Sequence, residues 1–216
     1  TRVACALLLA GRRLRLRAAG YKPVAPGARA DARGELRNVD ARLLLQHGNV
    51  ALPYDSVNPY VFAPPIAPHL AAAAAGREIE LATLDRIHRE VAAAADLVVV
   101  EGAGGWRVPL NDASDFSDWI AARGWPVVLV VAMRLGCLNH ALLSAEAISR
   151  QAKLVGWVAN LVPPELRESE ALIATLQRRL PVPMMARSRA NQLLAIVAEL
   201  LHPWLAGTLR GPQDSH

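Results

Sequence analysis

Apolar and polar residues alternate in blocks along the chain, and the apolar blocks have the length of strands. Three continuous apolar runs stand out, at 96–101, 126–132 and 154–160. Strands that are buried on both faces have this pattern, because neither face presents polar side chains to water. Helical periodicity predicts helices at 2–11, 39–47, 69–75, 81–95, 115–123, 138–151 and 165–179, and Asn38 is a good N-cap for the second.

Three segments fall outside this alternation. Residues 15–22 are predicted to be extended, because Leu14 to Arg17 alternate as on the outer face of a strand. The proline-rich stretch 52–68 is predicted to be irregular, and the tail at 207–216 to be frayed. The repeated β–α order predicts an α/β fold, a parallel sheet flanked by helices, in one domain over 1–216.

Composition narrows the class of protein further. None of the apolar runs approaches the ~18–20 residues of a membrane span, and the first one, at 3–10, is too short for a signal peptide. The two cysteines, Cys5 and Cys137, do not form a disulfide framework or a zinc motif, so we expect a cytoplasmic protein. The net charge of +5 is spread along the chain, which argues against nucleic-acid binding.

Polar side chains follow three of the predicted strands. Lys22, Glu101 and Asn160 lie at or just past strand ends, where ligands bind in parallel α/β sheets. Of the 24 basic residues only Lys22 and Lys153 are lysines, so a retained lysine within a motif indicates a need for a compact ammonium. These residues predict a binding site at this edge of the sheet.

Seven short motifs occur in a characteristic order and spacing. They are GYKPVAPG (20–27), RNVDA (37–41), VNPYVF (57–62), APHLA (67–71), VEGAGGW (100–106), LGCLNHA (135–141) and GWVAN (156–160). In that order they resemble the dethiobiotin synthetases, over residues 1–180. The resemblance implies a three-layer P-loop NTPase-like domain and an ATP-dependent ligase of biotin biosynthesis.

The resemblance also implies the reaction and its participants. Such enzymes join CO2 to 7,8-diaminononanoate with ATP and Mg²⁺, and release dethiobiotin, ADP and phosphate. A carbamate forms on one amine, ATP phosphorylates it, and the second amine closes the ring. The family enzyme is a homodimer with its active site at the subunit interface, and it does not need a membrane or a nucleic acid.

By the same resemblance, Lys22 is the catalytic residue that serves the carbamate and the γ-phosphate. Its alternative is a solvated lysine at a strand end. The metal ligands are Thr1, Asp40 and Glu101, although Asp40 could simply be an acid in the first turn of a helix. The ATP-binding residues are Thr1, Glu101, Gly102, Ala103, Gly104, Gly105 and Asn160. The glycines could instead form a plain turn, and Asn160, which would read the adenine edge, could cap the next segment.

The substrate-binding residues implied by the resemblance are Lys22, Pro26, Gly136, Cys137, Leu138 and Asn139. The last four precede a helix, come from the neighbouring subunit in the family, and hold the carboxylate tail of the substrate. Asn139 could alternatively be an ordinary N-cap, and we expect Cys137 to serve in packing. His69 is expected to be structural.

The chain departs from the family pattern in two places. It contains no G-x-x-x-x-G-K-[ST] segment; Thr1 aligns with the last position of such a loop, so a strand and loop of about fifteen residues are expected upstream. Pro26 stands where the family has a hydroxyl residue. Two alternative functions stay open: a non-catalytic dimerising homologue that has lost ATP binding, and a related P-loop amidoligase.

Overall fold

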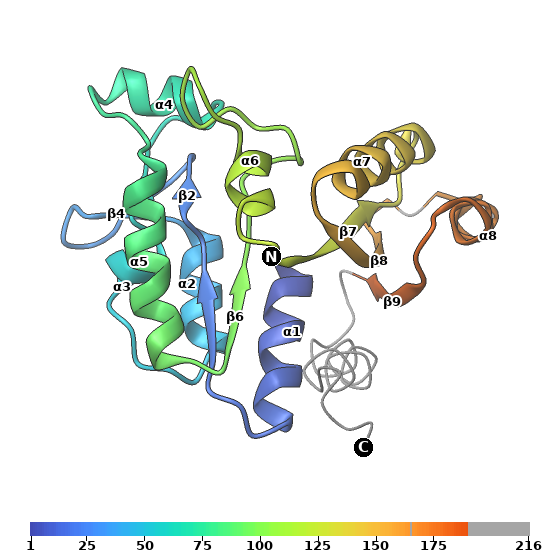
Figure 1. The fold of residues 1–216 in the computed structure, drawn as a ribbon, viewed down its shortest axis with the longest axis horizontal. Coiled ribbons are helices and arrows are strands. Elements are labelled where there is room, and N and C mark those ends of the chain that lie inside the picture. The colour runs from blue at the N-terminus through green and yellow to red at the C-terminus, as the bar shows by residue number, and fades with distance from the viewer. Residues whose placement is uncertain (165, 190–216) are drawn as a thin grey trace. The chain divides into compact units, whose positions relative to one another are not determined.

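The computed structural model describes residues 1–164 and 166–189, which form two compact units, one over Thr1–Trp119 and a second that begins at Ile120. The first unit is built around two parallel strands, β1 (Ala18–Tyr21) and β6 (Leu97–Val100). They lie side by side in Figure 1, with Ala18 opposite Leu97 and Tyr21 opposite Val100. The parallel α/β arrangement predicted from the sequence is confirmed.

Three helices pack against this pair of strands. They are α1 (Arg2–Arg13), α2 (Val39–His47) and α5 (Leu81–Ala94). The apolar face of α1 is buried through Val3, Cys5 and Leu8, while β1 is buried along its whole length. Gly20 allows α2 to approach closely, because a Cβ atom there would lie 2.6 Å from Leu44 Cβ.

Shorter elements surround this core. They are β2 (Val24–Ala25), β3 (Arg29–Ala30), β4 (Leu36–Arg37), α3 (Tyr54–Val57), β5 (Tyr60–Val61), α4 (Pro68–Ala74) and α6 (Phe116–Ala121). Strand β2 pairs in parallel with β5, and β3 pairs with β4 as an antiparallel hairpin. The stretch predicted to be irregular at 52–68 is therefore partly ordered, by α3 and β5.

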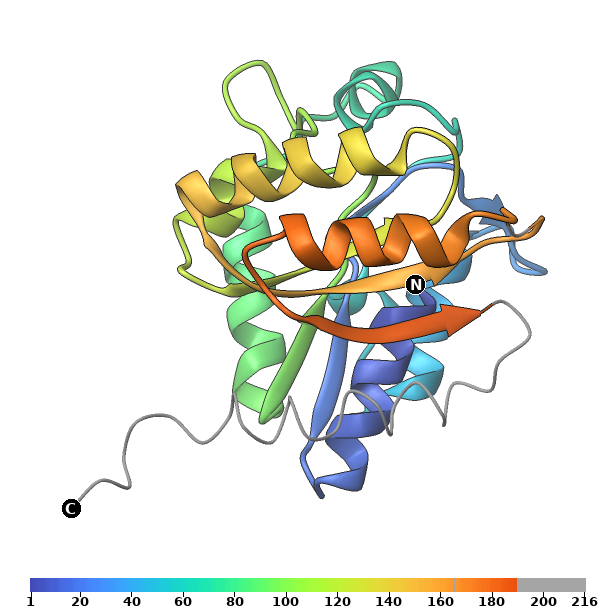
Figure 2. The ribbon, with the colours of Figure 1, turned by 90° about the vertical axis from the view of Figure 1, so that its right-hand side faces the viewer.

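The second unit contains the parallel strands β7 (Pro126–Ala132), β8 (Lys153–Leu161) and β9 (Met184–Arg189), in that order across the sheet. Helix α7 (Cys137–Gln151) packs on β7 and β8, and α8 (Ser169–Arg179) lies beside α7 (Figure 2). Its core includes Trp157, Ile148 and Ile173, all with 2% exposure or less.

One predicted segment is wrong. Leu14 to Arg17 do not form the outer edge of a strand: α1 continues to Arg13, and the chain then turns, with Arg15 at φ 61°. The turn satisfies carbonyls at the end of α1, since the N–H of Arg15 bonds to Arg12 O at 2.9 Å and that of Leu16 to Gly11 O at 3.1 Å.

The predicted helices and the three apolar strands agree with the structure to within a few residues, and α2 begins at its predicted N-cap Asn38. The short elements β2 to β5 and α3 were not predicted. Strand β9 was missed because MMARSR has neither alternation nor a continuous apolar run. The predicted tail at 207–216 lies outside the described residues. In the part of the chain that the structure describes, no helix has the length and apolar character needed to cross a bilayer.

Candidate active site

The first unit brings Lys22 and Glu101 together through strand pairing. Lys22 follows β1 and Glu101 follows β6, and the ladder continues one step past the strands because Glu101 N bonds to Tyr21 O at 2.9 Å. As a result, Lys22 Nζ lies 3.0 Å from Glu101 Oε1 and 2.6 Å from the carbonyl oxygen of Gly102. The predicted convergence of these two strand ends is present.

Asp40 reaches the same point from the start of α2. The Asn38 side chain caps this helix, since its Oδ1 accepts hydrogen bonds from Asp40 N at 2.8 Å and Ala41 N at 3.3 Å. The cap fixes the first turn, and Asp40 Oδ2 lies 3.7 Å from Lys22 Nζ. Asp40 is therefore a first-turn acid of α2 that also pairs with Lys22.

Thr1 completes the cluster. Its hydroxyl lies within hydrogen-bond distance of Asp40 Oδ1 and 2.9 Å from Glu101 Oε1, so its one proton is donated to one carboxylate or the other. Lys22 is 5% exposed, and the side chains of Glu101 and Asp40 are 16% and 31% exposed. We call these four residues, Thr1, Lys22, Asp40 and Glu101, the lysine–carboxylate cluster.

One carboxylate oxygen of the cluster has an unsatisfied hydrogen-bonding capacity. Among the described residues, Glu101 Oε2 is buried without a hydrogen-bond partner, and such an atom is costly unless something binds it. The negative charge of Glu101 also reaches the neighbouring α1, where burial, with a smaller contribution from Glu101, raises the pKa of the Cys5 thiol to about 11. Cys5 is therefore an unreactive packing residue.

The glycine-rich segment follows Glu101 directly. Gly102 is needed for close packing, because a Cβ there would lie 3.0 Å from the Phe116 ring, and Gly104 adopts φ 90°. Gly104 and Gly105 are exposed, and a Cβ at Gly105 would meet nothing within 4 Å. The segment is a tight turn whose last two residues remain open for an anion to approach.

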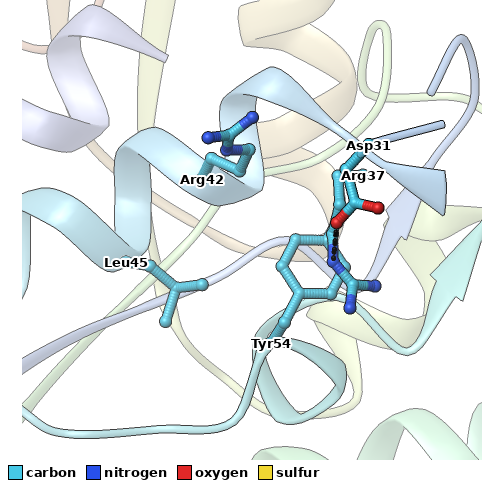
Figure 3. Close-up of a pocket in the computed structure, with 5 residues that line it drawn as sticks. All are labelled: Asp31, Arg37, Arg42, Leu45 and Tyr54. Atoms are coloured by element: carbon cyan, nitrogen blue, oxygen red, sulfur yellow. Dashed lines mark ion pairs between the residues drawn. The ribbon is translucent and has the colours of Figure 1, made fainter. Parts of the chain in front are cut away.

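Pro26 lies near the start of α2, where its carbonyl oxygen is 3.5 Å from Asn38 Nδ2. A separate pocket of about 340 Å³ lies beside β4, α2 and α3 (Figure 3). None of the lysine–carboxylate cluster lines it; its walls are Asp31, Arg37, Arg42, Leu45 and Tyr54.

The other predicted site residues belong to the second unit. Asn160 lies near the end of β8, where it is opposite Ala132 of β7 and Ser188 of β9. Gly136, at φ 88°, is the N-cap of α7, so Asn139 is not the cap. In the first turn, Cys137 is buried, as its predicted packing role requires, Leu138 is half-buried and Asn139 is exposed.

Sequence reasoning missed two contributions to the site. The carbonyl of Gly102, which accepts a hydrogen bond from Lys22, has no side-chain signature. Asn58 was passed over because it lies in the proline-rich stretch predicted to be irregular; a polar residue inside the VNPYVF motif was the signal available. Asn58 is only 1% exposed, and Lys22 O accepts a hydrogen bond from its Nδ2 at 2.7 Å.

An ammonium and a carboxylate follow two parallel strands, and a second carboxylate and a hydroxyl reach them from the starts of two helices. Ligands of parallel α/β proteins bind at this edge of the sheet, so the cluster defines the chain as an α/β protein with a polar binding site there. Comparison with known proteins agrees, since a family model described as an AAA domain matches residues 2–195.

Three curated relatives give the family more closely. An ATP-dependent dethiobiotin synthetase BioD of Pseudomonas aeruginosa (strain UCBPP-PA14) is 53% identical over 87% of this chain and 82% of its own. The dethiobiotin synthetase BioD of Pseudescherichia vulneris is 45% identical over 100% of this chain and 89% of its own. BioD 1 of Escherichia coli O157:H7 is 42% identical over 95% of this chain and 85% of its own. This chain belongs to the dethiobiotin synthetase family.

Proposed function

We propose that this chain catalyses the ATP-dependent carboxylation and ring closure of 7,8-diaminononanoate with CO2, giving dethiobiotin, ADP and phosphate. The observation that carries the proposal is the lysine–carboxylate cluster at the ends of β1 and β6. It occurs in a chain that is 53% identical to a named dethiobiotin synthetase over 189 residues.

In this proposal Lys22 serves the phosphoryl-transfer step. Negative charge builds up on the γ-phosphate oxygens and the carbamate as the phosphoryl group moves. An ammonium held in place by Glu101 and the Gly102 carbonyl meets that charge without having to reorganise. The 5% exposure of Lys22 excludes most competing water.

The cluster also fits Mg²⁺. Thr1, Asp40 and Glu101 offer hard oxygen ligands, and the unpartnered Glu101 Oε2 has an unused acceptor. The described residues contain no group of three or more His, Cys, Asp and Glu able to hold a metal, so we propose that ATP oxygens and waters would complete the ligand set. When bound, Mg²⁺ would neutralise phosphate charge.

The remaining contacts are proposed by family resemblance. Exposed backbone at Gly104 and Gly105 supports an anion-binding role for residues 102–105. Asn160 would read the adenine edge, and the first turn of α7, Gly136 to Asn139, would receive the substrate carboxylate. Pro26 lacks a hydroxyl, so one hydrogen bond to the substrate or to a phosphate made elsewhere in the family would be missing.

We further propose a homodimer in the cytoplasm, with each active site completed by the partner's α7 segment. The resemblance to the dethiobiotin synthetases supports this arrangement. Gel filtration with light scattering measures the oligomeric state, and a single monomer-sized species at micromolar concentration would contradict it.

The decisive experiment is to measure dethiobiotin from diaminononanoate, bicarbonate and Mg·ATP. Two proteins are compared: this 216-residue chain and a form preceded by the strand and phosphate loop that the family resemblance leads us to expect. We expect turnover in the extended form, with weaker ATP binding and lower activity in the shorter one. If both remain folded and neither makes dethiobiotin, the proposal is wrong.

The same assay separates the alternatives. A related amidoligase would release ADP with a different carboxylate substrate but make no dethiobiotin. A non-catalytic homologue would not bind Mg·ATP in a calorimeter. The intact lysine–carboxylate cluster favours the enzyme, since a buried lysine between two acids is costly to maintain and the proposed chemistry gives it a role.

A further inference from the structure

Asn58 connects the backbone of Lys22 to the side chain of Tyr54. Its Nδ2 donates to Lys22 O at 2.7 Å and to Tyr60 O at 3.2 Å, and its Oδ1 accepts from the Tyr54 hydroxyl at 2.9 Å. The residue is 1% exposed, and its amide nitrogen and oxygen are both engaged. Lys22 N bonds to Val57 O at 2.8 Å, so the same segment holds both backbone groups of Lys22.

Tyr54 continues the connection to α2. Its hydroxyl accepts a hydrogen bond from Asn38 N at 2.8 Å while it donates to Asn58. Asn38 in turn caps α2 by accepting from Asp40 N at 2.8 Å. A continuous chain of hydrogen bonds therefore runs from Lys22 through Asn58, Tyr54 and Asn38 to Asp40.

The ring of Tyr54 is fixed from its other side. The guanidinium of Arg37 lies 4.2 Å from the ring centroid, a cation–π distance. Arg37 is held by ion pairs of 3.9 Å to both Asp31 and Asp55, and the first of these is drawn in Figure 3. The hydroxyl at the centre of the chain therefore has little freedom to move.

We propose that Asn58 and Tyr54 are positioning residues of the active site, which set the placement of Lys22 relative to Asp40. This inference rests on the proposed function, which gives Lys22 and Asp40 their roles. Phosphoryl transfer depends mainly on placement and electrostatics, so a small shift between an ammonium and a metal-binding carboxylate lowers the rate. A fully satisfied buried network is suited to hold such a spacing.

The test is Tyr54→Phe, with Tyr60→Phe as its matched control. The hydroxyl of Tyr60 accepts a backbone N–H at the start of a helix too, from Glu80 N at 3.1 Å, and an arginine, Arg77, lies 5.0 Å from its ring. Both substitutions remove a hydroxyl that accepts a backbone N–H at the start of a helix, and the Tyr54 hydroxyl in addition donates to Asn58. Only the first lies on the connection between Lys22 and Asp40.

For Tyr54→Phe we expect kcat for dethiobiotin formation to fall between about tenfold and 100-fold. The KM for ATP should stay within about threefold, while the Mg²⁺ concentration for half-maximal rate rises. Tyr60→Phe should lower the melting temperature by a similar amount and keep kcat within about twofold. Equal losses of kcat in the two variants would show that the hydroxyl matters only for stability, and would overturn the proposal.

A double-mutant cycle with Asn58→Ala adds a second criterion. If Tyr54 and Asn58 act through one chain, the double variant should lose hardly more kcat than the worse single variant. Multiplying losses would instead mean independent effects, and the proposal fails. All variants are assayed at a temperature where circular dichroism shows them folded.

Amide hydrogen exchange tests the same connection without turnover. Tyr54→Phe should speed exchange at the amides of both Lys22 and Asp40, and Tyr60→Phe at neither. If the wild-type protein makes no dethiobiotin while this pattern holds, the proposed function fails and the connection stands. If exchange rises at neither amide, or at Asp40 alone, the connection itself is refuted.

Discussion

At the scale of single residues, the site depends on how Lys22 is compensated. Its ammonium lies 3.0 Å from Glu101 Oε1 and 3.7 Å from Asp40 Oδ2, almost removed from water. Buried charges are stable only with partners, so each of these three groups offsets the cost of burying the others. Loss of the lysine leaves two acids close together with Thr1 as their remaining shared neighbour.

We expect Lys22→Ala to lower kcat for dethiobiotin at least about 100-fold, because the transition-state charge loses its counter-charge. Lys153→Ala is the control: it removes the chain's other lysine, which is exposed at the start of β8. The measurement is steady-state dethiobiotin formation at saturating ATP. Comparable activity of the two variants would remove Lys22 from the chemistry.

The sequence was sufficient to predict the members of the cluster that follow strands or begin a helix. Lys22 and Glu101 end predicted strands, and Asp40, in the first turn after the cap Asn38, was assigned through the family resemblance. It was not sufficient for Asn58, whose importance comes from a buried position that a proline-rich stretch does not reveal. It was misleading at Leu14 to Arg17, where the ending of a helix produces the same alternation as a strand edge.

At the scale of elements, the contact between α2 and β1 fixes where Asp40 meets Lys22. Gly20 lies one residue before the end of β1, and Leu44 lies one turn beyond Asp40 on α2. The 2.6 Å between Leu44 Cβ and a Cβ built on Gly20 leaves no room for a methyl group. Backbone or helix would have to move.

Gly20→Ala should therefore lower the free energy of unfolding by about 1–3 kcal/mol. It should also raise the Mg²⁺ concentration needed for half-maximal rate, since α2 carries the proposed metal ligand Asp40. Gly105→Ala, where a Cβ meets nothing within 4 Å, should leave the urea midpoint unchanged. Urea denaturation followed by circular dichroism checks both, and an unaltered midpoint for Gly20→Ala would mean that the helix adjusts freely.

The other ends of β1 and β6 are joined by Arg17 and Asp96. Arg17 N donates to Asp96 Oδ2 at 2.9 Å and its side chain to Asp96 Oδ1 at 2.6 Å. The hydrogen bonds from the side chain and then the backbone of Arg17 lower the pKa of Asp96 to about 2. This pair sets the register at the end of the strands away from the site.

Because the folded pKa of Asp96 is below its unfolded value, its contribution to stability is present above about pH 5 and is lost as the pH falls toward about 2. Asp96→Asn should have a lower melting temperature than the wild type at pH 7, and the difference between the two melting temperatures should narrow as the solution is acidified. Melting curves across this range measure it. A gap that is constant with pH would show that the charge of Asp96 contributes nothing.

At the scale of the whole molecule, the proposed homodimer requires α7 to lie at the subunit interface. This helix begins at the segment proposed to reach the partner's substrate. Its apolar residue Leu143 is 58% exposed to solvent. A single exposed leucine is normal on a protein surface, but at a proposed subunit contact it supplies apolar area that association would bury.

Leu143→Asp should shift the protein toward monomer and reduce activity on dilution, because a buried unpaired charge opposes association. Leu70→Asp changes a leucine of α4 with similar exposure, 52%, and should leave the dimer intact. Light scattering across a concentration series measures the mass of each. If Leu143→Asp is as dimeric as Leu70→Asp, α7 is not at the subunit interface.

The pairing of Tyr21 with Val100 has a kinetic consequence. Lys22 and Glu101 become neighbours only when two strands separated by nearly eighty residues of intervening chain dock in register. Such a long-range contact is slow to form, because the loop must close before the contact stabilises it. During synthesis and refolding, the ability to bind ligand should therefore appear late, after the local helices have formed. The time at which Mg·ATP affinity appears would then mark the time at which this unit finishes folding.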